Sequence, residues 1–264
     1  MNCYETAPEF IDEDNRRFRA RNPISMQQMH NKHEALLPEE VVHGKSILDL
    51  GCCLGATGHW CLSHGATRET GIELQSEYAQ IAEKLLNKYH SGKFAIKQMA
   101  IEEWLKQPDK PSFDVVCLLG VMYAFVDYYS ILKLVASLTG STLVIESSYF
   151  DALKKRPTFC GVAFMDDQPI NLASETSSLV GRGTRVSPKG FEWLMKAFGF
   201  VSNEGIILPE PIAGTPDIYN RPLELLGETY PIRFLMRFIK TDASVHSLSE
   251  DLQRGEGIKT PWVP

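Results

Sequence analysis

Ile47-Leu48-Asp49-Leu50-Gly51-Cys52-Cys53-Leu54-Gly55 is the stretch that decides the fold of this 264-residue chain. An apolar run from Ser46 to Leu50 carries a carboxylate, breaks into a glycine-bearing turn, and gives way to a helical pattern from about Ala56. Gly51 would let the backbone pass close to a ligand, and Gly55 would let helix and strand approach. The order strand, tight turn, helix predicts the opening unit of an α/β fold that binds a nucleoside.

A second acid supports this interpretation. Glu73 ends the next apolar run, Glu69–Glu73, about 20 residues after the glycine turn, where an acid suits a bidentate contact with a ribose diol. The glycine spacing is D-x-G-x-x-x-G rather than the G-x-G-x-x-G of dinucleotide sites. The pattern therefore favours a mononucleoside cofactor over a dinucleotide.

These residues resemble the first motif of the class I S-adenosylmethionine (SAM) dependent methyltransferases, usually written D/E-x-G-x-G-x-G. Cys53 stands where the middle glycine is common, so its side chain narrows the site or forces a different turn. The resemblance implies SAM as cofactor and these cofactor-binding residues: Asp49, Gly51, Cys53, Gly55, Glu73, Leu74, Ala100, Ile101, Glu102, Leu119 and Gly120. In such a site Asp49 orients the loop or binds the amino group, Glu73 binds the ribose, and residues 100–102 lie along the adenine. Leu119 and Gly120 lie beside the sulfonium carbon.

Composition limits the other function classes. The chain is 44% hydrophobic with a net charge of −6 and a pI near 5.7, so it carries no globally basic nucleic-acid footprint. Its six cysteines form no C-x-x-C pair, which predicts reduced thiols and no metal site. No run reaches about 18 apolar residues and no signal-peptide core is present, so we expect a cytoplasmic protein without a membrane span.

Strand-like and helix-like patterns alternate along the chain. The spacing predicts helices over 25–37, 75–89, 101–105, 128–138 and 188–196, and strands over 46–50, 69–73, 93–99, 113–119 and 141–146, with a late strand from Phe200. This alternation predicts a doubly wound, Rossmann-like, mostly parallel sheet of seven strands. Residues 1–40 are interpreted as an N-terminal helical lid or cap, 41–210 as the SAM-binding domain, and 211–264 as a C-terminal extension packing on it. Residues 151–186 form an inserted substrate cover, and 151–185 read as irregular.

The N-terminal segment is rich in arginine. Arg16, Arg17, Arg19 and Arg21 lie on a polar background. They indicate either a solvated cap or a mobile lid over the cofactor that closes on an anionic group.

Two residues at predicted strand ends are the candidate catalytic side chains. The Tyr123 ring could face the sulfonium, or its hydroxyl could bind a substrate carboxylate. The Glu146 carboxylate could bind a substrate amine or take a proton. Tyr149, Arg182 and Arg185 are candidate substrate-binding residues, the arginines for an acidic substrate.

A second resemblance narrows the family. Phe113–Tyr123 and Ser187–Phe200 are similar to segments of the tRNA uridine-modifying alkyltransferases that use carboxy-SAM, although Ala124 replaces that family's usual histidine. We expect methylation of a small polar or carboxylated metabolite. RNA alkylation, intramolecular cyclisation of SAM with release of methylthioadenosine, and a non-catalytic SAM-binding scaffold remain alternatives. The sequence does not fix the oligomeric state.

Overall fold

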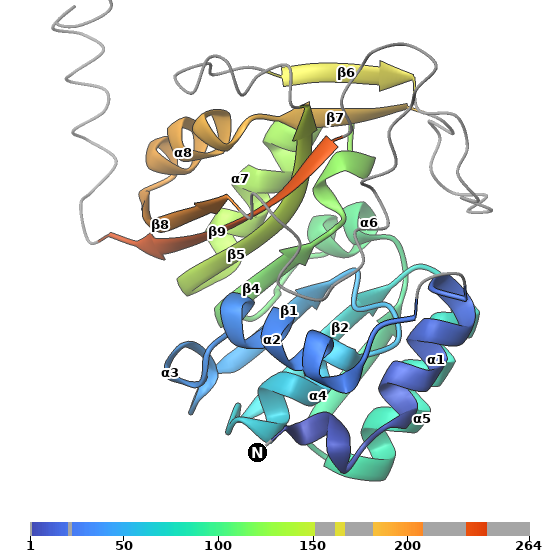
Figure 1. The fold of residues 1–264 in the computed structure, drawn as a ribbon. Helices are drawn as coiled ribbons and strands as arrows, with labels where there is room; N and C mark the ends of the chain where they lie inside the picture. Colours follow the sequence, from blue (N-terminus) through green and yellow to red (C-terminus); the bar gives the residue numbers. More distant parts are fainter. Residues whose placement is uncertain (1, 21–22, 151–161, 167–181, 208–230, 242–264) are drawn as a thin grey trace, which may run out of the picture.

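Figure 1 shows the computed structural model, which describes residues 2–20, 23–150, 162–166, 182–207 and 231–241. A seven-stranded sheet runs through it in the order β3-β2-β1-β4-β5-β9-β8. The strands are β1 (Ser46–Leu50), β2 (Arg68–Glu73), β3 (Phe94–Gln98), β4 (Phe113–Leu119), β5 (Thr139–Phe150), β8 (Phe200–Ile207) and β9 (Pro231–Lys240). The first five pair in parallel, whereas β9 pairs antiparallel with both β5 and β8. The prediction of a mostly parallel, seven-stranded α/β sheet is confirmed.

Helices cover both faces of this sheet. On one face, side chains of α6 (Ile101–Lys106), α7 (Tyr128–Leu138) and α8 (Pro188–Ala197) share a hydrophobic core with the strands. On the other face the core includes α4 (Ala56–Ser63), α5 (Ser76–His90) and the N-terminal elements η1 (Cys3–Glu5), α1 (Glu9–Phe18), α2 (Met26–Leu36) and α3 (Glu39–Val42). This double cover explains why β1 and β4 are nearly continuous apolar runs.

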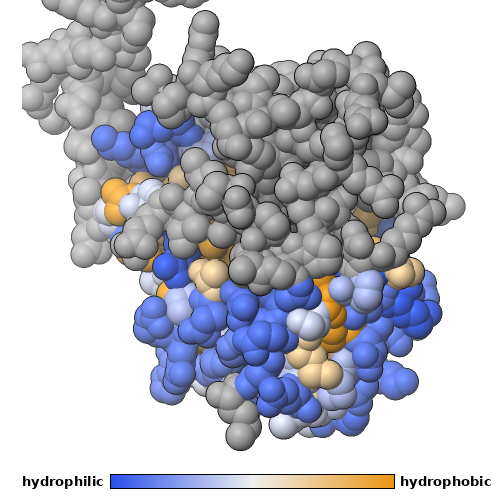
Figure 2. All heavy atoms as spheres, viewed as in Figure 1, coloured by the Kyte–Doolittle hydropathy of each residue, from blue (hydrophilic) through white to orange (hydrophobic). Residues whose placement is uncertain are grey.

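The N-terminal helices belong to the folded body. Tyr4, Phe10 and Ile11 are almost completely buried, and burial of such a side chain contributes roughly 1.5–3 kcal/mol. Asn15 closes the turn between α1 and α2 through two hydrogen bonds with Ile24, at 2.8 and 2.7 Å. The outward face of the N-terminal helices is largely hydrophilic (Figure 2). The apolar contacts fasten this segment over the core, and movement of a lid stays a prediction.

One segment differs from the sequence expectation. Within residues 151–185, expected to be irregular, β6 (Val162–Asp166) and β7 (Arg182–Val186) pair as a two-stranded antiparallel sheet. The strands are short and 15 residues apart, so no tight-turn signal marks them as a hairpin. β7 packs against β5 and against the short helix η2 (Met122–Ala124), near the end of β5 (Figure 1). This small sheet therefore lies beside the segment that carries Tyr123.

The helices and strands that the sequence did predict begin and end within a few residues of expectation. β5 is longer than predicted, because it continues beyond Glu146 to pair with β9. β9 comes from the predicted C-terminal extension and lies inside the sheet. None of the helices that the structure describes is long and apolar enough to cross a membrane.

Candidate cofactor and acceptor site

The carboxyl ends of the central strands bring the candidate residues together. Asp49 on β1 is in register with Gly71 of β2 and Cys117 of β4, and Leu119 is in register with Glu146 of β5. Gly120 donates its backbone N–H to the Glu146 carbonyl at 2.9 Å. The ends of β2, β1, β4 and β5 thus form one continuous edge, as the parallel order predicted.

The glycine loop needs its glycines for two different contacts. Gly51 has a φ of 85°, and a Cβ there would lie 2.4 Å from the Val121 side chain. Gly55 has a φ of 81°, and a Cβ there would lie 3.1–3.3 Å from Ala82 and Leu86 of α5. Gly55 therefore permits α4 and α5 to pack together, which corrects the expectation of a helix–strand approach.

Cys53 adopts the turn that the missing glycine would have favoured. Its φ of 52° is left-handed, which is uncommon for a residue with a side chain. Its backbone N–H donates to Glu73 Oε2 at 2.9 Å, which holds the loop against the end of β2. Burial raises the pKa of the Cys53 thiol to about 12, so the thiol is neutral.

Glu73 is held in place by backbone donors. Its second carboxylate oxygen accepts the Gln75 N–H at 2.8 Å, and the side chain is almost buried. Burial raises the pKa of Glu73 despite these hydrogen bonds. Each carboxylate oxygen can accept more than one hydrogen bond, so the group can still receive hydroxyl donors from a ligand.

Asp49 is a buried acid in need of a donor. Within the described residues, its Oδ2 atom is buried without a hydrogen-bond partner. Burial raises the pKa of Asp49 to about 7, and the nearby Glu73 adds to the rise whereas Lys32 opposes it. A buried acceptor without a donor is costly, so this position suits a cationic ligand group.

A cavity of about 120 Å³ opens beside Asp49 and the glycine loop. Its lining joins Asp49, Gly51, Cys53 and Leu119 from the strand ends to residues of the N-terminal segment. These are Phe10, Asp14, Arg19, Met29, Lys32 and His33. The sequence predicted, as one alternative, that the arginine-rich segment with Arg19 closes over the cofactor, but it gave no sign that the other N-terminal residues line the site. No spacing rule links them to the glycine loop, because tertiary packing creates the contact.

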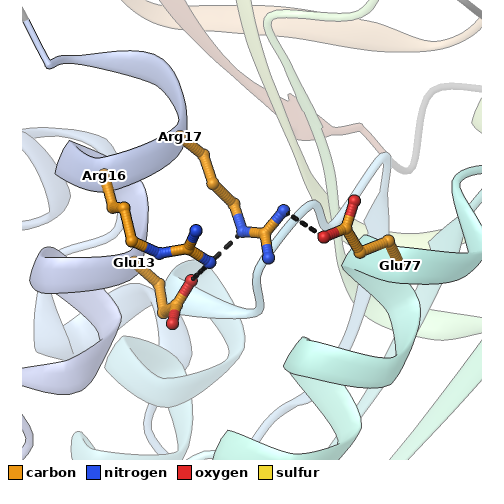
Figure 3. Close-up of polar contacts among 4 residues, drawn as sticks. All are labelled: Glu13, Arg16, Arg17 and Glu77. Carbon is orange, nitrogen blue, oxygen red and sulfur yellow. Dashed lines mark hydrogen bonds and ion pairs between the residues drawn. The ribbon is translucent and has the colours of Figure 1, made fainter.

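The arginines of the N-terminal segment pair with acids. Figure 3 shows Arg17 between Glu13 of its own helix and Glu77 at the start of α5, with nitrogen–oxygen distances of 3.1 and 2.6 Å. Arg16 also pairs with Glu13, and Arg19 pairs with Asp14 at the cavity. Arg21 lies outside the described residues. The Arg17–Glu77 pair connects α1 to α5, and among the described arginines of this segment Arg19 lies at the cavity.

His33 fixes the floor of the cavity through a hydrogen-bond chain. The Tyr4 hydroxyl donates to the Ala56 carbonyl at 3.0 Å and therefore accepts from His33 Nδ1 at 2.9 Å. The Thr57 hydroxyl lies 3.3 Å from His33 Nε2. Burial lowers the pKa of His33 to about 3, so the ring is neutral. It therefore holds its neighbours through hydrogen bonds and does not offer a positive charge to a ligand.

Lys32 and Glu146 form an ion pair next to this cavity. The Lys32 ammonium on α2 lies 3.2 Å from Glu146 Oε2, and the Glu146 side chain is nearly buried. Sequence reasoning selected Glu146 and missed Lys32, because a lysine on an amphipathic helix usually faces solvent. The pair connects the N-terminal helices to the end of β5.

The remaining candidate residues lie just after β2, at the start of α6, in η2 and along β5 and β7. Ala100 caps α6, Ile101 is partly buried against the core, and Glu102 is exposed on the first turn of that helix. Leu74 and Tyr123 are half-buried, the latter in η2 after β4. The side chains of Tyr149, Arg182 and Arg185 lie outside the described part, although their backbones belong to β5 and β7. Among the described residues, no cluster of three or more His, Cys, Asp or Glu could hold a metal ion.

Comparison with known proteins identifies the central segment. A family model described as a methyltransferase domain matches residues 47–139, from β1 to the start of β5. The chain carries a methyltransferase domain over these residues. The matched residues include the glycine loop, Glu73 and Leu119, which are the residues that the geometry brings to one edge.

Solved structures share the fold of this methyltransferase domain. A SAM-dependent methyltransferase from Mesorhizobium loti is 19% identical, with a TM-score of 0.55, over 81% of this chain and 98% of that one. The magnesium protoporphyrin IX methyltransferase of Synechocystis PCC 6803, solved with bound SAM, is 10% identical with a TM-score of 0.54, over 91% and 98%.

One curated relative matches part of the chain. An uncharacterized protein of Haemophilus influenzae is 34% identical over 97 residues, which are 36% of this chain and 38% of the relative. The match therefore spans less than two fifths of that protein's length. The match indicates a segment that the two proteins share, and it does not identify a methyl acceptor.

Proposed function

We propose that this chain transfers a methyl group from SAM to a small polar or carboxylated molecule. The observation that carries the proposal is the Asp49 Oδ2 atom, which has no hydrogen-bond partner among the described residues and lies at a cavity beside the glycine loop. Ligand pockets usually measure roughly 300–1,000 Å³, so a cavity of about 120 Å³ suits one end of the cofactor, with the nucleoside along the strand edge towards Glu73.

The chain's own groups match the parts of this cofactor. Asp49 would accept from the α-ammonium group, Arg19 would face the carboxylate, and Glu73 would accept from the ribose hydroxyls. Residues 100–102 lie at the start of α6, next along the edge, where they would border the adenine. When bound, SAM supplies a methyl group on a sulfonium, which is a good leaving group. The protein's part is to place the acceptor near Leu119 and Gly120 and to exclude water.

The first test combines binding with product analysis. We expect S-adenosylhomocysteine to bind the purified chain in a calorimetric titration. We also expect SAM to give S-adenosylhomocysteine only when a small-molecule extract is added. Methylthioadenosine formed from SAM alone would instead support cyclisation, and salt-sensitive retention of tRNA would support an RNA acceptor. No binding of either SAM or S-adenosylhomocysteine would refute the proposed function.

Removal of the Glu73 carboxylate is expected to weaken the cofactor complex. The Glu73→Ala variant loses charged hydrogen bonds to the ribose, so S-adenosylhomocysteine should bind about 1–3 kcal/mol more weakly by calorimetry. Glu73→Gln keeps an acceptor for one loop amide and should lose less. The exposed Glu103→Ala serves as the control, and native affinity in Glu73→Ala would remove Glu73 from the ribose site.

Tyr123→Phe is expected to affect turnover rather than cofactor affinity. The hydroxyl group is proposed to bind the acceptor, so its loss should lower turnover about tenfold, the equivalent of one hydrogen bond. Calorimetric affinity for S-adenosylhomocysteine should stay within about twofold of native. Tyr129→Phe, an exposed tyrosine on α7, is the matched control. Equal turnover of Tyr123→Phe and native protein would exclude a role for this hydroxyl.

A further inference from the structure

We propose that Lys32 binds a carboxylate group of the methyl acceptor and that Glu146 positions Lys32 for this contact. The inference rests on the proposed function, because it assumes that the cofactor lies along the strand edge. It names the acceptor-recognition residue and the chemical class that it selects.

The location of the ion pair separates it from the adenosine side. Along the edge, the order β2-β1-β4-β5 places Glu73 at one side, Asp49 in the middle and Glu146 at the other side. Lys32 lines the cavity together with Asp49 and Leu119, and its ammonium contacts Glu146 at 3.2 Å. It therefore stands beyond the end of β4, on the side away from the ribose-binding acid.

The burial of the pair argues for a role in binding. The Glu146 side chain is 6% exposed, whereas the Lys32 side chain is 26% exposed. Buried ion pairs are weak evidence for stability, because desolvation offsets the attraction between the charges. An ammonium has three N–H donors, so a contact with Glu146 fixes its position while the solvent-facing side can donate to a ligand. Glu146 thus acts through Lys32 and is a positioning residue.

The surrounding charges select a monoanion. An amine would have to displace Lys32 from Glu146, and Asp49 is assigned to the cofactor. Around the same cavity the described residues supply three acids, Asp14, Asp49 and Glu146. The two cations described there are already paired, Arg19 with Asp14 and Lys32 with Glu146, so they do not balance a phosphate dianion as well. A single carboxylate gains a charge-assisted hydrogen bond from Lys32 and leaves the pair with Glu146 in place.

The test measures carboxylate binding without turnover. The full-length chain, saturated with S-adenosylhomocysteine, is titrated by NMR with propionate and benzoate and with their neutral amides, propionamide and benzamide. The native protein should prefer each carboxylate over its amide by about 10-fold or more, which is the size expected for a hydrogen bond to a charged group. Lys32→Gln should abolish this preference, and Lys32→Arg should retain it.

Further variants keep the result independent of folding. Lys32→Gln removes the ammonium group that lies against the buried Glu146 carboxylate. The double variant Lys32→Gln/Glu146→Gln removes both charges and should show the same loss of preference. Lys133→Gln, an exposed lysine on α7, is the control and should behave as native. A native protein without a carboxylate preference, or a preference that survives in Lys32→Gln or in the double variant, overturns the inference.

The cofactor affinity of the same variants separates the two proposals. Affinity for S-adenosylhomocysteine should change less than about threefold in Lys32→Gln, because Lys32 is assigned to the acceptor. A loss of cofactor affinity as large as the loss of carboxylate preference would assign Lys32 to the cofactor's own carboxylate and overturn the inference. Failure of S-adenosylhomocysteine to bind the native chain would instead refute the proposed function.

Discussion

Replacing Glu69 by glutamine is expected to make the protein more stable, by a margin that grows with pH. Glu69 on β2 is 1% exposed, and within the described residues neither of its carboxylate oxygens has a hydrogen-bond partner. Its side chain lies where a Cβ on Gly58 or Gly71 would meet it, at 3.0 and 2.8 Å. Burial first, and the nearby Asp49 second, raise the pKa of Glu69 well above 4.5.

The direction of the effect follows from proton release. At a pH between the two pKa values, the unfolded chain has lost the Glu69 proton and the folded protein has kept it. Unfolding then releases a proton, so higher pH favours the unfolded state. The free energy of unfolding of the native protein therefore falls by about 1.4 kcal/mol for each pH unit above 4.5, until the Glu69 carboxyl ionises in the folded protein. Glutamine has the same shape and does not titrate.

Denaturant unfolding from pH 5 to pH 8 measures this margin. The difference in the free energy of unfolding between Glu69→Gln and native protein should increase steadily with pH from 5 upwards. Glu83→Gln, an exposed glutamate on α5, should show no such trend. A constant difference across the range, or a variant that is less stable throughout, would show that Glu69 is ionised or paired in the folded protein.

Loss of the Asp49 carboxylate has the second largest expected effect. Asp49→Asn removes a charged acceptor from a buried position opposite the cofactor's ammonium group. Hydrogen bonds to charged groups contribute about 1.5–3 kcal/mol, so affinity for S-adenosylhomocysteine should fall about 10- to 100-fold. Calorimetry at pH 8, where native Asp49 is mainly ionised, gives the full difference.

The pH dependence of binding provides a separate readout. Burial raises the pKa of Asp49 to about 7, so the proton must leave before the acid can bind an ammonium group. Native affinity should therefore rise up to about tenfold per pH unit below pH 7 and level off above it. Asp49→Asn should flatten this rise, and the exposed Asp109→Asn should keep it. A native profile that is flat between pH 5.5 and 8 would contradict the assignment.

The sequence predicted the parts of the molecule that rest on local pattern. Strands such as Phe113–Leu119 and the turn at Gly51 carry their structure in consecutive residues, and parallel strand order then places Asp49, Glu73, Leu119 and Glu146 on one edge. Cys53 was expected to narrow the site or to force a different turn, and it instead takes the left-handed conformation that glycine favours, with its N–H bonded to Glu73. The strands, the turn and the contact between Cys53 and Glu73 each involve residues within about 25 positions of one another in the chain.

The rest depends on contacts between distant segments. β6 and β7 are too short to give a recognisable strand pattern in the sequence, and each becomes a strand by pairing with the other. Lys32 and Arg19 reach the cavity because apolar residues such as Phe10 fasten the N-terminal helices to the core. The sequence showed an arginine-rich stretch. It did not show that Arg17 pairs with Glu77 away from the cavity, whereas Arg19 lies at the cavity. Specificity residues contributed in this way cannot be found from motif spacing.

The position of β9 affects how the molecule is assembled during synthesis. β9 lies between β5 and β8, although it is made after both. Until residues 231–240 have left the ribosome, β5 and β8 both lack the strand that pairs with them in the described sheet, and β5 keeps an open hydrogen-bonding edge. Such an edge is a template for pairing with another nascent chain. A stalled or truncated product ending before residue 231 should therefore aggregate, even though the whole methyltransferase segment has already been translated.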